Sequence, residues 1–219
     1  MGVQGSVASL VSHYFDADPT VPSAPRTVPL VLPDLAVDLA TDTGVFGRDA
    51  VDRGTRLLLL EGPEPPHRGA LLDLGCGYGP ITVALARRSP EATVWGVDVN
   101  PRARALTAAN AEAAGCTNVQ VASPDAVPAD LRFATIWSNP PIRIGKAALH
   151  DLLLHWLRRL EPEGRAVLVV QKHLGADSLA RWLEVAGHPT ERLSSRMGYR
   201  LLAVAAGPGP ERDEPGDGR

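Results

Sequence analysis

The sequence is poor in cysteine, has no long apolar run and carries no strong excess of one charge. Its two cysteines, Cys76 and Cys116, are too few for a disulfide framework or a cysteine-based zinc site. The histidines show no ligand-like spacing to carboxylates or cysteines, so we expect no metal. A net charge of −3 gives no general attraction for nucleic acid, so any RNA binding requires a local basic patch.

No apolar run is long enough to cross a bilayer, and no basic stretch followed by an apolar one opens the chain. We therefore expect neither a membrane span nor a secretory signal, and we expect a cytoplasmic protein. The 219 residues fit one main domain with a small attachment.

The most informative stretch is 71–80, LLDLGCGYGP. An apolar run predicts a buried strand, alternate glycines follow Asp73, and Pro80 suits the first turn of a helix. A strand, glycine loop and helix in this order is the usual place for a nucleotide-like ligand. The dinucleotide fingerprint does not fit, because its third glycine position holds Pro80, and the chain has no G-x-x-x-x-G-K-[ST] loop. A glycine-rich turn without a ligand remains the alternative.

From Ala70 onward the pattern alternates strands and helices, which predicts an α/β fold with a parallel sheet and helices on both faces. The expected strands begin with the apolar run at 70–72 and continue at 93–97, 119–122, 133–137 and 165–170, with 191–194 and 199–205 as a closing antiparallel pair. The expected helices start at Pro80 and span 101–114, 147–160 and 176–186.

Residues 1–69 are expected to form an attachment too small to bury a core alone, so it should pack against the main domain at 70–207. Its expected elements are a short helix at 7–11, a hairpin of strands 28–32 and 35–39, a helix at 52–60 and a linker at 62–69. The polar tail at 208–219 is expected to be disordered.

Two acidic residues follow later strands. Asp98 ends the second strand, where a carboxylate can bind ribose hydroxyls, although it could instead cap the next helix, a role that Asn100 fills better. Asp125 follows the third strand and could accept the amino hydrogen of an adenine, although a solvated loop acid has the same appearance.

The stretch SNPPIRIGK at 138–146 has a chemical rationale. An exocyclic amine on a planar ring is a poor nucleophile because its lone pair is delocalised. The Asn139 side-chain oxygen and the Pro140 carbonyl can each accept one amine hydrogen, which favours a pyramidal nitrogen. Proline stiffens the turn and so presets the acceptors. A rigid strand-to-loop turn without chemistry is the alternative.

The motif D-x-G-x-G-x-G at 73–79 resembles the first motif of the class I S-adenosylmethionine methyltransferases. Together with NPPIR-x-GK, HYF, TDTGVF, D-x-G-T-x-LLL and the C-terminal GYR, it resembles the bacterial ribosomal RNA guanine-N2 methyltransferases of the small-domain methyltransferase family. The resemblance covers about residues 12–205 and suggests a short form without a duplicated N-terminal half. It implies the class I methyltransferase fold with a mostly parallel seven-stranded sheet, and methyl transfer to N2 of a guanine in small-subunit RNA.

The resemblance also implies a site. The expected catalytic residues are Asn139, Pro140 and Pro141. Asp73 is expected to face the ammonium group of S-adenosylmethionine, and the glycines to pass under its carboxylate and ribose. The full expected cofactor site comprises Asp73, Gly75, Cys76, Gly77, Gly79, Asp98, Val99, Asn100, Asp125, Ala126 and Asn139.

Substrate contacts are expected around the same corner. Many amine methyltransferases carry Tyr or Phe after Asn-Pro-Pro, whereas this chain has Ile142. We therefore expect Phe15 or Phe46 to stack on the target base instead. The alternative is that either side chain serves only in packing within the protein. Basic residues expected to bind RNA phosphates, rather than merely to be solvated, are Arg143, Lys146 and Lys172, with Arg196 and Arg200 beside them.

Other functions remain open at this point. Asn-Pro-Pro also suits a protein glutamine amide or an adenine as methyl acceptor. A non-catalytic RNA-binding module with the same fold is a third reading, which the intact set of motif residues disfavours.

Overall fold

The structure is a computed structural model that describes residues 21–207. The expected helix at 7–11, the HYF motif with Phe15 and the expected tail at 208–219 lie outside these residues. Within residues 21–207, no helix is long and apolar enough to cross a membrane.

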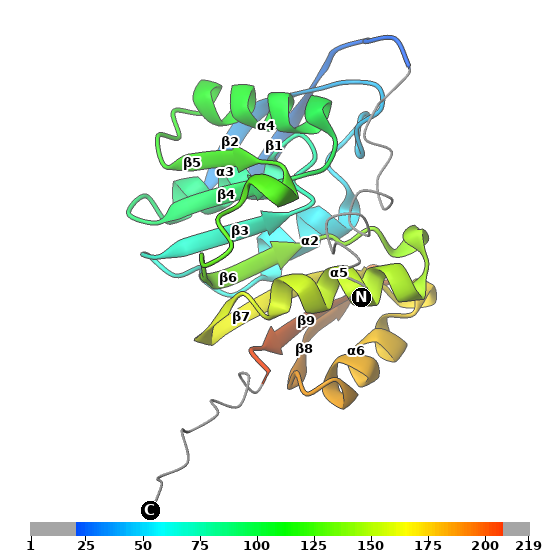
Figure 1. The fold of residues 1–219 in the computed structure, drawn as a ribbon. Coiled ribbons are helices and arrows are strands. Elements are labelled where there is room, and N and C mark those ends of the chain that lie inside the picture. The colour runs from blue at the N-terminus through cyan, green and yellow to red at the C-terminus, as the bar shows by residue number, and fades with distance from the viewer. Residues whose placement is uncertain (1–20, 208–219) are drawn as a thin grey trace, which may run out of the picture.

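The centre of the fold is a seven-stranded sheet with the order β5-β4-β3-β6-β7-β9-β8 (Figure 1). Only β9 runs antiparallel to its neighbours. The mostly parallel sheet predicted from the sequence is thereby confirmed. The strands are β3 (Ala70–Leu74), β4 (Thr93–Val97), β5 (Val119–Ala122), β6 (Phe133–Ser138), β7 (Leu160–Gln171), β8 (Thr190–Arg196) and β9 (Tyr199–Ala205).

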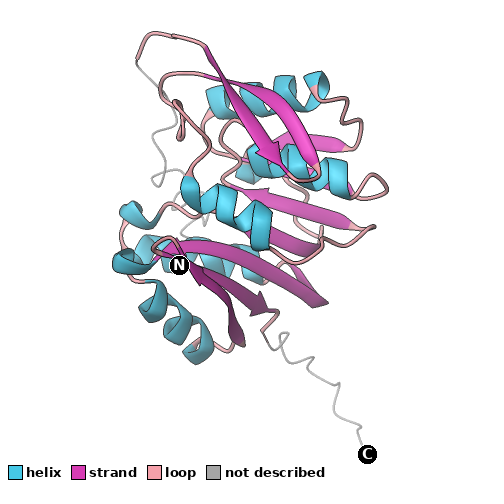
Figure 2. Ribbon diagram, turned by 180° about the vertical axis from the view of Figure 1, so that it is seen from behind, coloured by secondary structure: helices cyan, strands magenta, loops and turns pink. Residues whose placement is uncertain are grey.

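Helices cover both faces of this sheet (Figures 1 and 2). One face carries α2 (Arg53–Glu61), α3 (Pro80–Arg88) and α4 (Pro101–Ala113). The other carries α5 (Lys146–Leu157) and α6 (Ala176–Val185). Short 3-10 turns follow three strand ends: η1 (Pro124–Ala126), η2 (Ile142–Ile144) and η3 (Lys172–Leu174).

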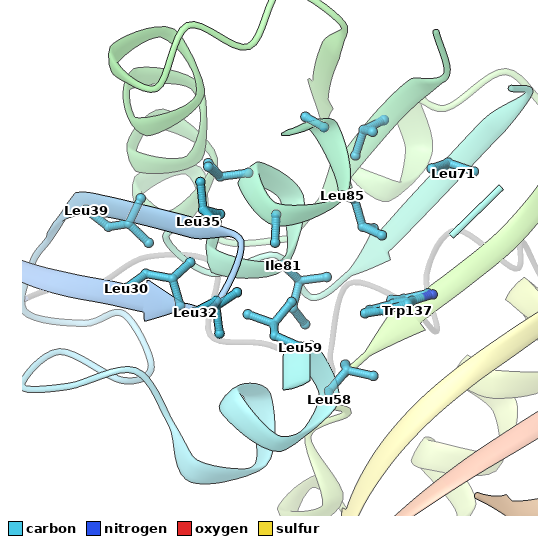
Figure 3. Close-up of a cluster of buried hydrophobic side chains, with 14 of the residues drawn as sticks. Leu30, Leu32, Leu35, Leu39, Leu58, Leu59, Leu71, Ile81, Leu85 and Trp137 are labelled. Atoms are coloured by element: carbon cyan, nitrogen blue, oxygen red, sulfur yellow. The ribbon is translucent and has the colours of Figure 1, made fainter. Parts of the chain in front are cut away.

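A two-stranded hairpin, β1 (Arg26–Leu32) and β2 (Leu35–Thr41), lies over α3 and α4. Its alternating leucines point into the same buried cluster as α2, α3 and Trp137, because strand side chains on one face recur every second residue (Figure 3). The ion pair between Arg88 and Asp34, at 2.7 Å, fixes the hairpin turn to α3. The predicted hairpin is confirmed, with each strand longer by two residues.

One predicted boundary is wrong. The helix expected to reach Leu160 ends at Leu157, and Leu160 opens β7 five residues before the predicted strand. The leucine is four residues from Trp156 and so fits a helical spacing, but it is also buried as a strand residue paired with Phe133. The Phe133 amide donates to the Arg159 carbonyl at 2.8 Å, so the backbone here bonds to β6 and does not extend the helix.

Asn110 in α4 joins the hairpin to the glycine loop. Its Oδ1 accepts from the Ala40 amide at 2.7 Å, and its Nδ2 donates to the carbonyls of Ala40 at 2.8 Å and Tyr78 at 2.7 Å. The side chain is buried, with 3% exposed. The Asn110 side chain therefore satisfies backbone groups on the edge of β2 that does not pair with β1.

Replacing Asn110 by alanine is expected to lower the free energy of unfolding by about 2–4 kcal/mol, because three backbone groups in a largely buried region lose their partner. Denaturant unfolding measures this. The control is Glu112→Ala, an exposed position on the same helix, for which a change within about 0.5 kcal/mol is expected. Equal stability of the two variants would contradict the bridging role of Asn110.

Candidate active site

A cavity of about 700 Å³ opens at the carboxyl ends of β3, β4 and β6. Its volume is typical of small-molecule sites, and ligands of open α/β sheets bind at this edge. Segments far apart in the sequence meet on its wall. The wall residues are Gly44, Val45, Phe46, Gly47, Asp52, Thr55, Gly75, Cys76, Gly77, Tyr78, Pro80, Ile81, Asp98, Asn100, Ala103, Asn139, Pro140, Pro141, Ile142, Arg143, Gln171, Leu174 and Tyr199.

The glycine loop presents bare backbone to this cavity. Gly75 and Gly77 have φ angles of 79° and 58°, in the region that side chains rarely adopt. A Cβ on Gly75 would meet no atom within 4 Å, so the space above it is open to a ligand. Gly79 differs, because a Cβ there would lie 3.1 Å from Thr107, so this glycine allows α3 and α4 to pack closely.

Asp98 holds the glycine loop to the next strand end. Its carboxylate accepts from the Gly77 amide at 3.0 Å and from the Asn100 amide at 2.9 Å. Burial raises the pKa of Asp98, and these hydrogen bonds oppose that rise. Asn100, as expected, caps α4, and its Nδ2 donates to the Gly44 carbonyl at 2.9 Å. Asp98 lies on the wall, and its contact with a ribose remains a prediction.

Asp73 is fully buried in β3 and does not reach the cavity wall. Its Oδ2 accepts from the Thr82 hydroxyl at 2.6 Å, whereas its Oδ1 has no partner among the described residues. Burial raises the pKa of Asp73 to about 7, despite the opposing hydrogen bond from Thr82. Asp73 therefore lies behind the wall, and its contact with the ammonium group of S-adenosylmethionine remains a prediction, whereas the open space above Gly75 fits this ligand.

The Asn139 amide has a fixed orientation. Its Nδ2 donates to Asp52 Oδ1 at 2.8 Å and to Thr55 Oγ1 at 3.0 Å. A carboxylate only accepts, so Asp52 selects the nitrogen side of the amide. Asn139 Oδ1, which accepts no hydrogen bond from the described residues, is thereby left available to a ligand.

The two prolines form a tight turn beside this amide. The Ile142 amide donates to the Pro140 carbonyl at 2.9 Å, and Pro141 between them has φ −75° and ψ 78°, typical of an inverse γ-turn. A carbonyl oxygen has two lone pairs, so Pro140 keeps one acceptor site. Asn139 Oδ1 and the second lone pair of Pro140 are the two acceptors expected for an amine, and that role remains a prediction.

Asp52, Thr55 and Tyr199 also lie on the wall, although they were not among the predicted site residues. Asp52 was expected only as the first residue of a helix, and it does cap α2 through the amides of Gly54 and Thr55. A Cβ on Gly54 would come within 2.7 Å of Tyr199, so this glycine allows β9 to approach the cap. The D-x-G-T spacing was the available signal, because it combines a cap with a close backbone approach.

Other predicted site residues lie at varying distances from the cavity. Phe46, with 68% exposed, is on the wall, as are Ile142 and the exposed Arg143. Val99, Asp125, Ala126, Lys146 and Lys172 are not on the wall.

Two of the basic residues already have acidic partners. Arg196 pairs with Glu61 at 2.8 Å, and the buried Arg200 pairs with Asp177 at 3.1 Å. Residues 21–207 contain no group of three or more His, Cys, Asp or Glu that could hold a metal ion.

Residues 36–203 match the model of one protein family, described as the methyltransferase small domain. The chain belongs to the methyltransferase small domain family. The uncharacterized protein YbxB of Bacillus subtilis is 36% identical over 193 residues, which are 87% of this chain and 96% of YbxB. The family that the sequence motifs resembled is thus confirmed.

Longer relatives share the same part. Ribosomal RNA small subunit methyltransferase C of Shewanella pealeana is 33% identical over 65% of this chain and 42% of its own length. The 16S rRNA N2 methyltransferase RsmC of T. thermophilus, solved with AdoMet and guanosine, has a TM-score of 0.73 and 28% identity, over 85% of this chain and 52% of that one. The chain thus spans about half the length of these ribosomal RNA methyltransferases. The structural match confirms the class I methyltransferase fold.

We expect the affinity for S-adenosylmethionine to rise between about pH 6 and pH 7.5 and then to level off. With a pKa of about 7, Asp73 is largely protonated at the lower pH and ionised above it. A cationic ligand nearby favours the ionised form and lowers this pKa, so binding releases a proton. Titration calorimetry in buffers of different ionisation enthalpy measures both effects.

Asp73→Asn is expected to abolish this proton release, whereas the exposed Asp130→Asn is expected to retain it. An unchanged proton release in Asp73→Asn would show that another group titrates.

Proposed function

We propose that this protein is an S-adenosylmethionine-dependent methyltransferase that methylates N2 of a guanine in ribosomal RNA. The observation that carries the proposal is the Asn139 amide, which lies on the cavity wall with the bare glycine loop and whose nitrogen is held by Asp52 and Thr55. The family supports methyl transfer, and the ribosomal RNA relatives support the guanine acceptor. The reaction takes place in the cytoplasm.

When bound, S-adenosylmethionine supplies an electrophilic methyl group on a sulfonium. The Gly75 and Gly77 backbone, Asp98 and Asp73 would hold the donor. Asn139 Oδ1 and the free lone pair of Pro140 each accept one hydrogen of the guanine amine, which localises the nitrogen lone pair. Transfer of that methyl group to the nitrogen would leave S-adenosylhomocysteine, and the methylated amine would release its extra proton to water. Holding the amine and the methyl donor in the reactive geometry would supply most of the rate enhancement.

The remaining site residues are assigned to the nucleic acid. We propose that Phe46 stacks on a guanine flipped out of its helix, and that Arg143 binds a phosphate at the rim. Lys146 and Lys172 extend this basic rim beyond the wall. We keep the proposed division into an attachment at 1–69 and a catalytic domain at 70–207, and we propose that the described part of the attachment, residues 21–69, covers the donor.

Labelled methyl transfer tests the proposal with ribosomal subunits, naked ribosomal RNA, tRNA and total protein as acceptors. We expect N2-methylguanosine in ribosomal RNA by mass spectrometry of the nucleosides. Asn139→Ala is expected to lower kcat about 100-fold, because one preset acceptor is lost, with donor affinity within about threefold. Label found only in protein or on adenine would contradict the guanine acceptor, and absence of label despite tight donor binding would favour a non-catalytic module.

Phe46→Ala is expected to lower kcat/KM for RNA about tenfold at saturating donor, because stacking of one base on an aromatic ring contributes about 1–3 kcal/mol. The control is Val31→Ala, another exposed apolar position, on the hairpin. Unchanged turnover of Phe46→Ala would remove this side chain from the site.

A further inference from the structure

The two oxygens of the Asp52 carboxylate differ in their hydrogen bonds to the described residues. Its Oδ1 accepts from the Gly54 amide at 2.8 Å, the Thr55 amide at 3.1 Å and Asn139 Nδ2 at 2.8 Å. Its Oδ2 accepts no hydrogen bond from the described residues. Asp52 lies on the cavity wall and is only half-buried, so this oxygen is open to a ligand.

The free oxygen lies next to the amide that we assign to the target amine. Guanine carries an N1–H donor directly beside its N2 amine. Adenine, and a purine with an amine at C2 but no O6, present a lone pair at N1 instead. A carboxylate beside Asn139 accepts the N1–H of guanine and repels such a lone pair.

We propose that Asp52 selects guanine. Its Oδ1 turns the Asn139 amide so that the amide oxygen accepts from N2, and its Oδ2 accepts the neighbouring N1–H. The proposal rests on the proposed function and names the feature of the base that the site reads.

The surroundings of Asp52 keep this pair of acceptors rigid. The residue is the cap of α2, and the positive end of a helix favours a carboxylate at that position. The Tyr199 ring at the start of β9 lies close to Gly54, so this side chain limits movement of the cap toward β9. A rigid pair of acceptors discriminates between bases better than a mobile one, because it loses little conformational entropy when the base binds.

Asp52→Asn tests this selection with little risk to folding, because Asn caps helices about as well as Asp. Its oxygen can still serve Gly54, Thr55 and Asn139, but its NH₂ replaces Oδ2 and meets the N1–H donor. The acceptors are two ribosomal RNA fragments that carry either guanine or 2-aminopurine at the methylated position. 2-Aminopurine keeps the C2 amine but has a lone pair at N1.

We expect the natural protein to prefer guanine over 2-aminopurine about 100-fold in kcat/KM, and Asp52→Asn to reduce this ratio to below about tenfold. Donor affinity by calorimetry is expected to stay within about threefold. The control is Asp49→Asn, an exposed acid in the neighbouring loop, which is expected to keep the full ratio.

A merely structural role of Asp52 would lower both rates equally and leave the ratio unchanged, which would overturn this inference alone. If the natural protein transfers no methyl group to guanine, the proposed function fails and this inference with it. The two failures are therefore distinguishable by the activity of the natural protein.

Discussion

The hydrogen bond between Asn139 and Asp52 is the interaction on which the rest of the site depends. It joins the end of β6 to the start of α2, across 87 positions of sequence. Without it, the Asn139 amide could present either its oxygen or its nitrogen to the cavity, and only the oxygen can accept from an amine. The chemistry assigned to Asn-Pro-Pro therefore depends on a residue outside that motif.

The buried cluster around α2 holds the two ends of this hydrogen bond at a fixed distance. Trp137, two residues before Asn139, is fully buried against the leucines of α2 (Figure 3). A Cβ on Gly62, at the end of that helix, would come within 2.6 Å of the Trp137 ring, so helix and strand approach closely. The hairpin leucines close the same cluster from outside. The hairpin and α2 thus contribute to the geometry of the site through packing.

Local sequence signals predicted much of this structure. The signals for the strand–loop–helix units act within a few residues of the chain, so the sequence predicts these units directly. They are the alternate glycines, Pro80 at a helix start and Asn100 as a helix cap. The assignment of Leu160 to a helix is wrong because a buried leucine at this position fits both a helix and a strand. Only its pairing with Phe133 in the sheet shows that it belongs to β7. The helical positions of Asp52 and Thr55 follow from the sequence, but their contacts with Asn139 do not, because they span 87 and 84 positions and no periodicity encodes such a contact.

A crystal structure of the protein with S-adenosylhomocysteine and guanosine tests most directly whether Asn139 binds the guanine amine. We expect the guanine N2 to lie about 3 Å from Asn139 Oδ1, with Asn139 Nδ2 still bonded to Asp52. A guanine bound with its amine turned away from Asn139, or an Asn139 amide released from Asp52 in the complex, would contradict it.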